Sequence, residues 1–484
     1  MLIEEAPDQV PPVPAHTPLP CVAGNDLIVP LATGGQRRYT NLDLAASSPA
    51  LTAVVDAVNE FVPWYASVHR GAGFASQVST RAFEAARTAI ASFVGARPTD
   101  QVIFVRNSTE AINLLARALV LRPGHVVLST AVEHHANMLP WRRLAPVIHV
   151  APPPSPEALL ESVRAHLEDR RQPVGVLAVT GASNVTGEVF PIAELAVLAH
   201  EHGALVAVDA AQLAPRRAID MVASGIDCLA LSGHKMYAPF GSGALVAPTA
   251  LLEHVEPMLA GGGAVSYVTL DDVQWAGLPD RMEAGSPNVV GAIALAAAAR
   301  TLADTGMSAV AEHERQLLQH LSNRLSELPA LQPLRLWDDS VADRVGVCTF
   351  TVEGLPHALV AAALSAEHGI GVRHGCFCAH PYISHLLGVT MADAQAIRER
   401  LRRGEHRDIP GAVRASFGVC TTARDIDCLA DALCAITTMG PRLQYREDPA
   451  TGDYVVVDDV RAWPSFSLLP SLAGDLHGNG CGQF

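Results

Sequence analysis

The sequence predicts an α/β protein with a mainly parallel β-sheet, followed by a second, smaller α+β domain. From about residue 80, short apolar runs alternate with helical segments, which is the pattern of strand–helix–strand units. These runs lack polar alternation, as is typical of strands that are buried on both faces of a sheet. Beyond residue 300 the strands become fewer and the helical stretches longer, which indicates a separate domain.

The first domain contains six apolar runs that we expect to be strands. They cover residues 102–105, 126–128, 147–150, 174–179, 205–208 and 226–231. We expect a helix that is capped by Ser79 or Thr80 and ends at Gly95, because hydroxyl side chains favour the N-cap and glycine favours the C-terminal end. Another helix should open at Ser155-Pro156, where proline suits the first turn, and a further one should cover residues 192–200.

The second domain should contain a strand over residues 345–352, a helix over 358–367 and a strand that includes 371–373. A hairpin should follow from residues 443–446 and 454–457, around a turn rich in Asp, Pro and Gly. The expected division of the chain is an N-terminal extended arm at 1–38, a large domain at 39–300, a small domain at 301–440 with an insert at 382–412, and a C-terminal extension at 441–484.

Charge and hydropathy exclude several classes of protein. Lys and Arg number 34 and Asp and Glu 49, so the formal net charge is −15, which disfavours nucleic-acid phosphates. With 49% hydrophobic and 17% charged residues, the chain should be compact rather than disordered. The longest apolar run, 289–299, is too short to span a membrane, and the acidic, proline-broken start does not resemble a secretory signal. Nine scattered cysteines do not form a disulfide framework, so we expect a cytoplasmic protein without membrane or nucleic-acid partners.

Polar residues directly follow five of the expected strands. The clusters lie at residues 107–110, 133–137, 183–184, 209–212 and 232–235. Because ligands bind outside the carboxyl ends of the strands in an open parallel sheet, we expect these clusters to form one pocket.

The residue types in this pocket indicate a pyridoxal phosphate site. Ser108 and Thr109 open a helix, where unpaired N–H groups and the helix dipole favour a phosphate. Lys235 is the only lysine of the chain, and burial in its apolar surroundings would make its amine a nucleophile toward aldehydes. Asp209 could pair with a protonated ring nitrogen. These three features together specify pyridoxal phosphate, whereas the sequence has neither a Walker loop nor a complete dinucleotide-binding turn.

The same residues belong to motifs of a known family. The motifs occur at residues 41–46, 68–71, 106–113, 133–137, 141, 183–187, 208–212, 232–237, 261–263, 283–288, 373–381 and 414–416. On these stretches, which cover about residues 39–437 in unbroken order, the sequence resembles the class V aminotransferase family of fold-type I pyridoxal-phosphate enzymes. Within that family it is most similar to the Suf-type cysteine desulfurases and selenocysteine lyases. The resemblance implies a large domain with a mainly parallel seven-stranded sheet, a smaller α+β C-terminal domain and a homodimer.

The resemblance also implies roles for individual residues. Cofactor-binding roles fall on Ser108, Thr109, His134, Asn184, Asp209, Gln212, Ser232, His234, Lys235 and Ser286. Substrate-binding roles fall on Asn184, Arg373, Arg414, His69 and Arg70, and catalytic roles fall on Lys235, Cys378 and His134. By this resemblance Lys235 holds the cofactor and moves the substrate's α-proton, while Ser286 reaches in from the partner subunit.

Cys378 indicates the type of reaction. It falls where the desulfurases keep a nucleophilic cysteine before alanine, so its thiolate would attack the substrate's sulfur, form a persulfide and release alanine. The chain departs from the family's pattern at Cys376 and Phe377, and its link at residues 382–412 is longer than the usual one.

A metal site is an alternative reading of the same segment. If residues 373–381 form a strand, alternate side chains share one face, and these are His374, Cys376, Cys378 and His380. Four ligands at a spacing of two along one strand cannot easily close a tetrahedron, so we expect no metal.

The function that we expect is that of a cysteine desulfurase that acts on L-cysteine or a close analogue and passes sulfur to an acceptor protein. One alternative is a class V enzyme that carries out transamination, epimerisation or C–S β-elimination on a specialised amino acid, which the insert and the C-terminal extension favour. Another is a non-catalytic thiol or metal carrier on the same fold. The joint presence of Lys235, Asp209 and Arg414 argues against a carrier, because a scaffold has no need for them.

Overall fold

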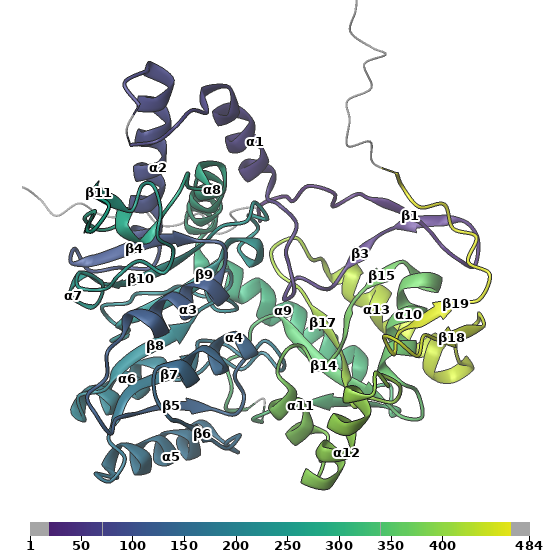
Figure 1. The fold of residues 1–484 in the computed structure, drawn as a ribbon. Coiled ribbons are helices and arrows are strands. Elements are labelled where there is room, and N and C mark those ends of the chain that lie inside the picture. Colours follow the sequence, from purple (N-terminus) through teal and green to yellow (C-terminus); the bar gives the residue numbers. More distant parts are fainter. Residues whose placement is uncertain (1–18, 70, 339, 466–484) are drawn as a thin grey trace, which may run out of the picture.

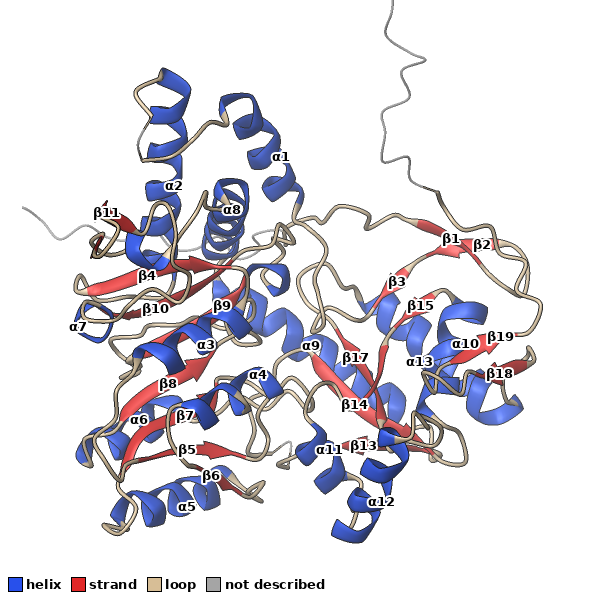
Figure 2. Ribbon diagram, viewed as in Figure 1, coloured by secondary structure: helices blue, strands red, loops and turns tan. Residues whose placement is uncertain are grey.

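The computed structural model describes residues 19–69, 71–338 and 340–465, and it confirms the expected α/β architecture. A seven-stranded sheet with the order β4-β10-β9-β8-β7-β5-β6 forms the centre of the larger part (Figures 1 and 2). Its strands are β4 (Asp100–Val105), β5 (Val126–Thr130), β6 (Val147–Val150), β7 (Val174–Thr180), β8 (Leu205–Asp209), β9 (Cys228–Ser232) and β10 (Gly243–Pro248). The pairs among β5 to β9 are parallel, whereas β10 runs antiparallel to β9 and β4. The sequence prediction missed β10, because glycine, alanine and proline have low strand propensity.

Helices cover both faces of this sheet. Successive residues of β5 point to opposite faces: Val127 packs in one apolar cluster with α3, whereas Val126 and Leu128 belong to another cluster with α5, α6 and α8. The helices of this part are α1 (Thr52–Phe61), α2 (Phe74–Phe93), α3 (Ser108–Ala118), α4 (His135–Met138), α5 (Pro156–Glu168), α6 (Ile192–Glu201), α7 (Thr249–Leu252) and α8 (Val289–Thr305). The cap predicted for the helix near residue 80 is wrong, because α2 begins at Phe74 after Gly73.

A second sheet, antiparallel and four-stranded, has the order β13-β14-β17-β16. Its strands are β13 (Leu331–Leu334), β14 (Val347–Val352), β16 (Arg373–Gly375) and β17 (Ala412–Ser416), and it packs with α9 (Met307–Leu325), α10 (His357–His368) and α13 (Ala423–Met439). A short parallel pair, β3 (Thr40–Asn41) with β15 (Ile370–Gly371), ties the N-terminal segment to this part. The division of the chain into these four segments stays a prediction.

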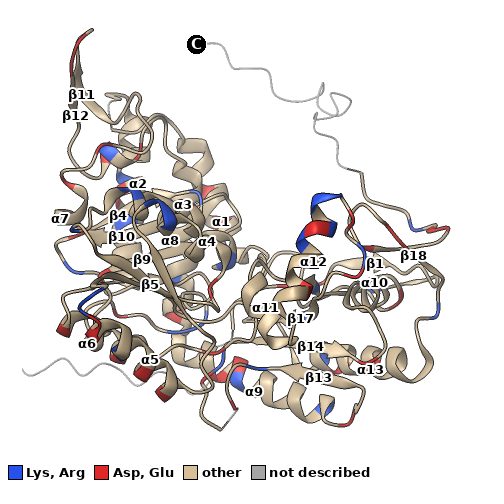
Figure 3. Ribbon diagram, turned by 60° about the horizontal axis from the view of Figure 1, so that its bottom comes forward, with Lys and Arg blue, Asp and Glu red and all other residues tan. Residues whose placement is uncertain are grey.

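The insert and the C-terminal extension are both folded where the structure describes them. The insert contains α12 (Met391–Arg402), whose N-terminus Thr390 and Asp393 cap reciprocally. This helix follows α11 (His380–Leu386) in the chain. The predicted hairpin is confirmed as β18 (Tyr445–Glu447) and β19 (Tyr454–Val456). Figure 3 shows basic and acidic residues interspersed on α12.

Short elements complete the described chain. They are β1 (Ile28–Pro30), β2 (Gln36–Arg38), β11 (Val265–Val268), β12 (Val273–Trp275), and the 3-10 turns η1 (Val62–Trp64), η2 (Pro140–Arg143), η3 (Gly233–Lys235) and η4 (Asp280–Met282). The arm predicted at 1–38 is a β1–β2 hairpin over its last part, and residues 1–18 lie outside the described ones. Within the described ranges no single helix is long and apolar enough to cross a bilayer. The pair of α8 and α9 meets both conditions only when the two helices are taken together, and a 78° bend separates them.

A buried ion cluster joins the two sheets. Glu314 on α9 is 0% exposed, and its carboxylate lies 3.2 Å from Arg216 and 3.3 Å from Arg217, which both follow β8. Its Oε2 also accepts the backbone N–H of Gly346, just before β14, at 3.0 Å. One carboxylate therefore neutralises two cations from the large sheet and fixes the start of a strand in the small one.

We predict that Glu314→Ala lowers the free energy of unfolding by roughly 3–5 kcal/mol, because it leaves the buried Arg216 without its counter-charge. Urea unfolding followed by circular dichroism measures this change. Glu312→Ala, on the same helix but facing solvent, should leave the unfolding midpoint unchanged. Equal destabilisation by the two variants would contradict the account.

Candidate active site

Lys235 lies at the carboxyl edge of the large sheet, in the short turn η3 that follows β9. Its side chain is partly buried, and burial lowers the pKa of its amine from 10.5 to about 8. The Asp209 carboxylate opposes this shift, while the Arg414 and Arg216 guanidiniums add to it. A substantial fraction of the amine is therefore neutral and nucleophilic near neutral pH.

Asp209 ends the neighbouring strand β8 and is 5% exposed. Its Oδ1 accepts the backbone N–H of Ala211 at 3.0 Å, and within the described part of the chain Oδ2 has no hydrogen-bond partner. Burial raises the pKa of the carboxyl, and the nearby Lys235 opposes that rise. The site thus offers one carboxylate oxygen to a cationic or N–H-bearing ligand.

The N-terminus of α3 supplies hydroxyl and N–H groups beside this pair. The Ser108 N–H donates to Ser232 Oγ at 2.8 Å, and Ser232 Oγ donates to Ser108 Oγ at 3.1 Å. Thr109 is exposed at the same helix end, and His234 precedes Lys235 with its pKa lowered to about 4 by burial and by that lysine. The two serines from distant strands therefore meet where a helix dipole favours an anion.

His134 caps α4 and is held in one neutral tautomer. Its Nδ1 accepts the backbone N–H of Ala136 at 3.0 Å, so the ring proton resides on Nε2. Burial lowers its pKa to about 3, and the positive charges of Lys235 and Arg414 act in the same direction. The ring is thus uncharged at neutral pH.

Glu133 stabilises the position of α4, and the sequence analysis assigned it no role. It is 0% exposed and accepts hydrogen bonds from Thr130 Oγ1 at 2.7 Å, from Asn137 Nδ2 at 2.7 Å and from the Thr180 N–H at 3.1 Å. Burial raises its pKa to about 8. The sequence did contain a signal for Glu133: an acidic residue comes soon after an apolar strand and directly before the predicted site residue His134.

Arg414 and Arg373 lie side by side on the paired strands β17 and β16, and Asp43 bridges them. The Asp43 carboxylate lies 3.3 Å from Arg414 and 2.8 Å from Arg373. Arg414 is 3% exposed, donates to the Asn184 carbonyl at 2.8 Å, and keeps a buried Nε without a partner among the described residues. Burial lowers its pKa to about 10. Asp43 was also missed, because only the fold brings residue 43 to these strands.

The segment at residues 373–381 is not one strand, which corrects the prediction. Strand β16 ends at Gly375, Phe377 and Cys378 form a turn with φ of 53° and 56°, and α11 begins at His380. The geometry behind the metal alternative, a shared strand face, is therefore absent. In residues 19–69, 71–338 and 340–465 no three His, Cys, Asp or Glu side chains are placed to hold a metal ion.

Two hydrogen bonds fix the Cys378 loop. Asn184 Nδ2 donates to the Phe377 carbonyl at 2.8 Å, and the His135 N–H donates to the Cys378 carbonyl at 2.8 Å. Cys378 itself is exposed, and a charge on its sulfur would raise the pKa of Lys235. The loop thus presents a thiol to the lysine.

The side-chain amides of Gln212 and Asn184 form hydrogen bonds within the chain itself. Gln212 Nε2 donates to the Ala45 carbonyl at 2.8 Å, and its Oε1 accepts from Arg216 at 2.5 Å. Both amides lie at the expected strand ends, and Gln212 retains one N–H for a ligand.

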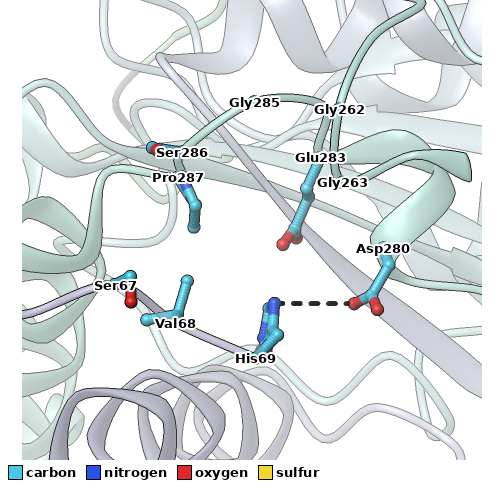
Figure 4. A pocket seen from close by; sticks show the side chains of 10 residues that line it. All are labelled: Ser67, Val68, His69, Gly262, Gly263, Asp280, Glu283, Gly285, Ser286 and Pro287. Atoms are coloured by element: carbon cyan, nitrogen blue, oxygen red, sulfur yellow. Dashed lines mark ion pairs between the residues drawn. The ribbon is translucent and has the colours of Figure 1, made fainter. Parts of the chain in front are cut away.

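His69 and Ser286 come together in a different pocket, as Figure 4 shows. This pocket has a volume of about 290 Å³, and its lining includes neither Lys235 nor Cys378. His69 lies 3.1 Å from Glu84 and 4.0 Å from Asp280. Arg70 lies outside the described residues. His69 and Ser286 therefore share a pocket that Lys235 of the same chain does not line.

The chain is similar to proteins of one family. The model described as Aminotransferase class-V matches residues 40–429. A protein of Halalkalibacterium halodurans named "Probable cysteine desulfurase" is 36% identical over 400 residues, covering 81% of this chain and 91% of that protein. A cysteine desulfurase of Escherichia coli is 34% identical over 402 residues, covering 81% and 92%. The apo structure of a cysteine desulfurase from Thermococcus onnurineus has a TM-score of 0.72 at 30% identity and covers 82% of this chain and 94% of that one.

We predict that Lys235 in protein freed of small molecules is acetylated by trace acetic anhydride with a midpoint near pH 8 rather than 10.5, because only the neutral amine reacts. Peptide mass spectrometry identifies the site without ambiguity, since the chain has no other lysine. Asp209→Asn should lower the midpoint further, because that carboxylate favours the charged amine. The N-terminal amine is the internal control, and a Lys235 midpoint near 10.5 would contradict the account.

Proposed function

The chain belongs to the class V aminotransferase family of enzymes, and from that premise we propose that it is a pyridoxal-phosphate-dependent cysteine desulfurase. Its substrate is L-cysteine or a close analogue, and its product is L-alanine. The observation that carries the proposal is the exposed thiol of Cys378, which lies on a loop that Asn184 fixes and whose thiolate form would raise the pKa of Lys235. A thiol in that place suits sulfur transfer, and transamination would not need it.

The residues at the edge of the large sheet suit this cofactor. Ser108 and Ser232 with the N-terminus of α3 would hold the phosphate, and Asp209 has a free carboxylate oxygen for the ring nitrogen. Thr109, His234 and the partner's Ser286 are further candidates for the phosphate, and Gln212 for the ring hydroxyl. When bound, pyridoxal phosphate supplies an electron sink for bonds that break at the substrate's α-carbon.

Lys235 and His134 are the groups that act next to the cofactor. The neutral Lys235 amine would hold the cofactor's aldehyde carbon, and the same Nζ would then accept and return the α-proton. The uncharged His134 ring can stack on an aromatic ring without adding charge to it. Its orientation is fixed by the Ala136 N–H and, through α4, by Glu133.

Arg414 is the proposed binding group for the substrate's carboxylate. Among the described residues its buried Nε has no hydrogen-bond partner, and its Nη2 donates to Asp43 at 3.3 Å. An incoming carboxylate can therefore bind Nε and replace the long hydrogen bond to Asp43. Asn184 flanks the same guanidinium through its carbonyl. Arg373, which is half exposed, lies on the side of the incoming sulfur.

Cys378 would accept the sulfur. Its thiolate attacks the substrate's sulfur, an S–S bond forms, and the C–S bond breaks with its electron pair passing to the substrate's β-carbon. A proton then completes the methyl group of alanine, so L-cysteine and the Cys378 thiol give L-alanine and a Cys378 persulfide without net oxidation.

The pocket of His69 and Ser286 supports a homodimer. His69 and Ser286 are proposed to complete the active site of the partner subunit, because the pocket that they line in their own chain does not include Lys235. The family resemblance implies the same role for Arg70. An interface that builds two active sites should be obligate.

We predict that Cys378→Ala still binds cofactor and L-cysteine, but loses multiple-turnover alanine formation by at least about 100-fold, because no thiol takes the sulfur. Cys376→Ala should keep the first sulfur transfer, since Cys378 and not Cys376 is among the groups whose charge affects Lys235. Alkylation of the persulfide followed by peptide mapping measures both. A persulfide on Cys376 alone would transfer the role to that residue.

We predict a dimer that buries on the order of 2,000 Å² or more, because the interface is part of the active site. Sedimentation velocity at assay concentration, with activity measured on the same sample, checks this. A fully active monomer would sink the proposal for His69 and Ser286.

A further inference from the structure

A second cavity, of about 790 Å³, adjoins the Cys378 loop on the small-domain side. One wall is the end of β16 and the turn that contains Cys376 and Cys378. The opposite walls come from the insert, with Leu401, His406 and residues 408–411, and from the β18–β19 hairpin, with residues 451–454. Both of these segments lie near the small sheet in Figure 1. The cavity is therefore made by the two parts of the chain that the proposed reaction leaves without a role.

Cys378 belongs to both spaces. A thiolate at Cys378 would raise the pKa of Lys235, and the same residue lines the second cavity. Cys376 also lines the second cavity. Sulfur that is held on Cys378 is thus next to a space large enough for a small organic molecule, since ligand pockets typically measure about 300–1,000 Å³.

We infer that this cavity binds a sulfur acceptor, and that this acceptor is a low-molecular-weight thiol with no net negative charge. The inference rests on the proposed desulfurase function and names the partner of the same site. Its first support is position, because an acceptor thiol must reach the terminal sulfur of the persulfide. Its second support is charge.

Carboxylates dominate the charged groups of the cavity lining. They belong to Asp408, Glu447 and Asp453. The one guanidinium in the lining, Arg373, is paired with Asp43 at 2.8 Å. Arg407, outside the lining, lies 3.9 Å from Glu447 and offsets that carboxylate in part.

Histidines of the same lining do not balance these acids. Burial lowers the pKa of His357 and of His374, so both rings are neutral at pH 8. The two rings stack with their centroids 5.4 Å apart, and His374 Nε2 lies 3.3 Å from Asp453 Oδ1. The remaining walls are mainly apolar, with Leu355, Phe377, Leu387, Leu401 and Ile409. A neutral or amine-bearing thiol with a small apolar body fits this lining, and an anionic thiol is repelled.

The transfer step balances without a further oxidant or reductant. The acceptor's thiolate attacks the terminal sulfur of the Cys378 persulfide, a new S–S bond forms, and the old S–S bond breaks. Cys378 leaves as a thiolate, and the acceptor carries the sulfur away as its own persulfide. Cys378 is then ready for another substrate molecule.

The test uses two small thiols of opposite charge, cysteamine and 3-mercaptopropionate. The holoenzyme is given one equivalent of L-cysteine, alanine is measured, and loss of the Cys378 persulfide is followed at pH 8 by alkylation and mass spectrometry. The readout is the rate constant with cysteamine divided by the rate constant with 3-mercaptopropionate. Comparison of that ratio between variants cancels the different intrinsic reactivities of the thiols.

Asp408→Asn/Asp453→Asn should reduce this ratio by about fivefold, because two attractive charges are removed. Asn suits the positive φ of Asp408, 49°, so the substitution preserves the backbone. The matched control is Asp458→Asn, an exposed position on the same extension with φ of 58° and outside the cavity, which should leave the ratio unchanged. An unchanged ratio in the double variant, or no persulfide loss with either thiol, would overturn the inference.

A second measurement separates this inference from the proposed function. In the resting protein, 2-aminoethyl methanethiosulfonate should label Cys376 faster than 2-sulfonatoethyl methanethiosulfonate, and the double variant should lose that preference. Absence of alanine and persulfide in the first assay would reject the desulfurase function. Equal labelling by the two reagents in the wild type would reject the charge-selective cavity.

Discussion

The two hydrogen bonds that hold the Cys378 loop tie it to Asn184 and His135, which follow strands of the large sheet. Phe377 and Cys378 both have positive φ, which costs energy in residues with a side chain, so the turn persists only because its surroundings fix it. Asn184, after β7, and His135, at the start of α4, each bind one carbonyl of the turn. The Phe377 ring in addition lies 4.9 Å from the Arg414 guanidinium. Arg414, the Cys378 loop and the segments that follow the large sheet's strands thus meet at one point.

The pocket at the sheet edge could be predicted because a simple rule governs it. Apolar runs of parallel strands are visible in sequence, and ligands bind where such strands end, so Ser108, Asp209 and Lys235 could be brought together before any fold was known. The resemblance added Cys378 and Arg414. The terminal hairpin was also predicted, because turn residues mark it locally.

The remaining features depend on contacts that no local pattern encodes. Alternating Cys and His in residues 374–380 imitate a strand, but the strand ends at Gly375, so the condition of the metal alternative is not met. Asp43 meets Arg414 across 371 residues of chain, and Glu133 meets Thr180 across 47. Ser79 and Thr80 have capping side chains, but they lie within α2 and donate to the carbonyls of Trp64 in η1 and of Ser76 in α2. Long-range contacts place Asp43, Glu133 and Ser79.

The central claim is that sulfur leaves the substrate onto Cys378 and not as a free product of elimination. Joint quantification of alanine, pyruvate and sulfide, after incubation of the purified holoenzyme with L-cysteine and dithiothreitol, tests it most directly. Desulfuration predicts alanine and sulfide in equal amounts with no pyruvate, because the β-carbon is protonated after the sulfur has moved. Pyruvate formed together with sulfide would contradict the account and indicate C–S β-elimination.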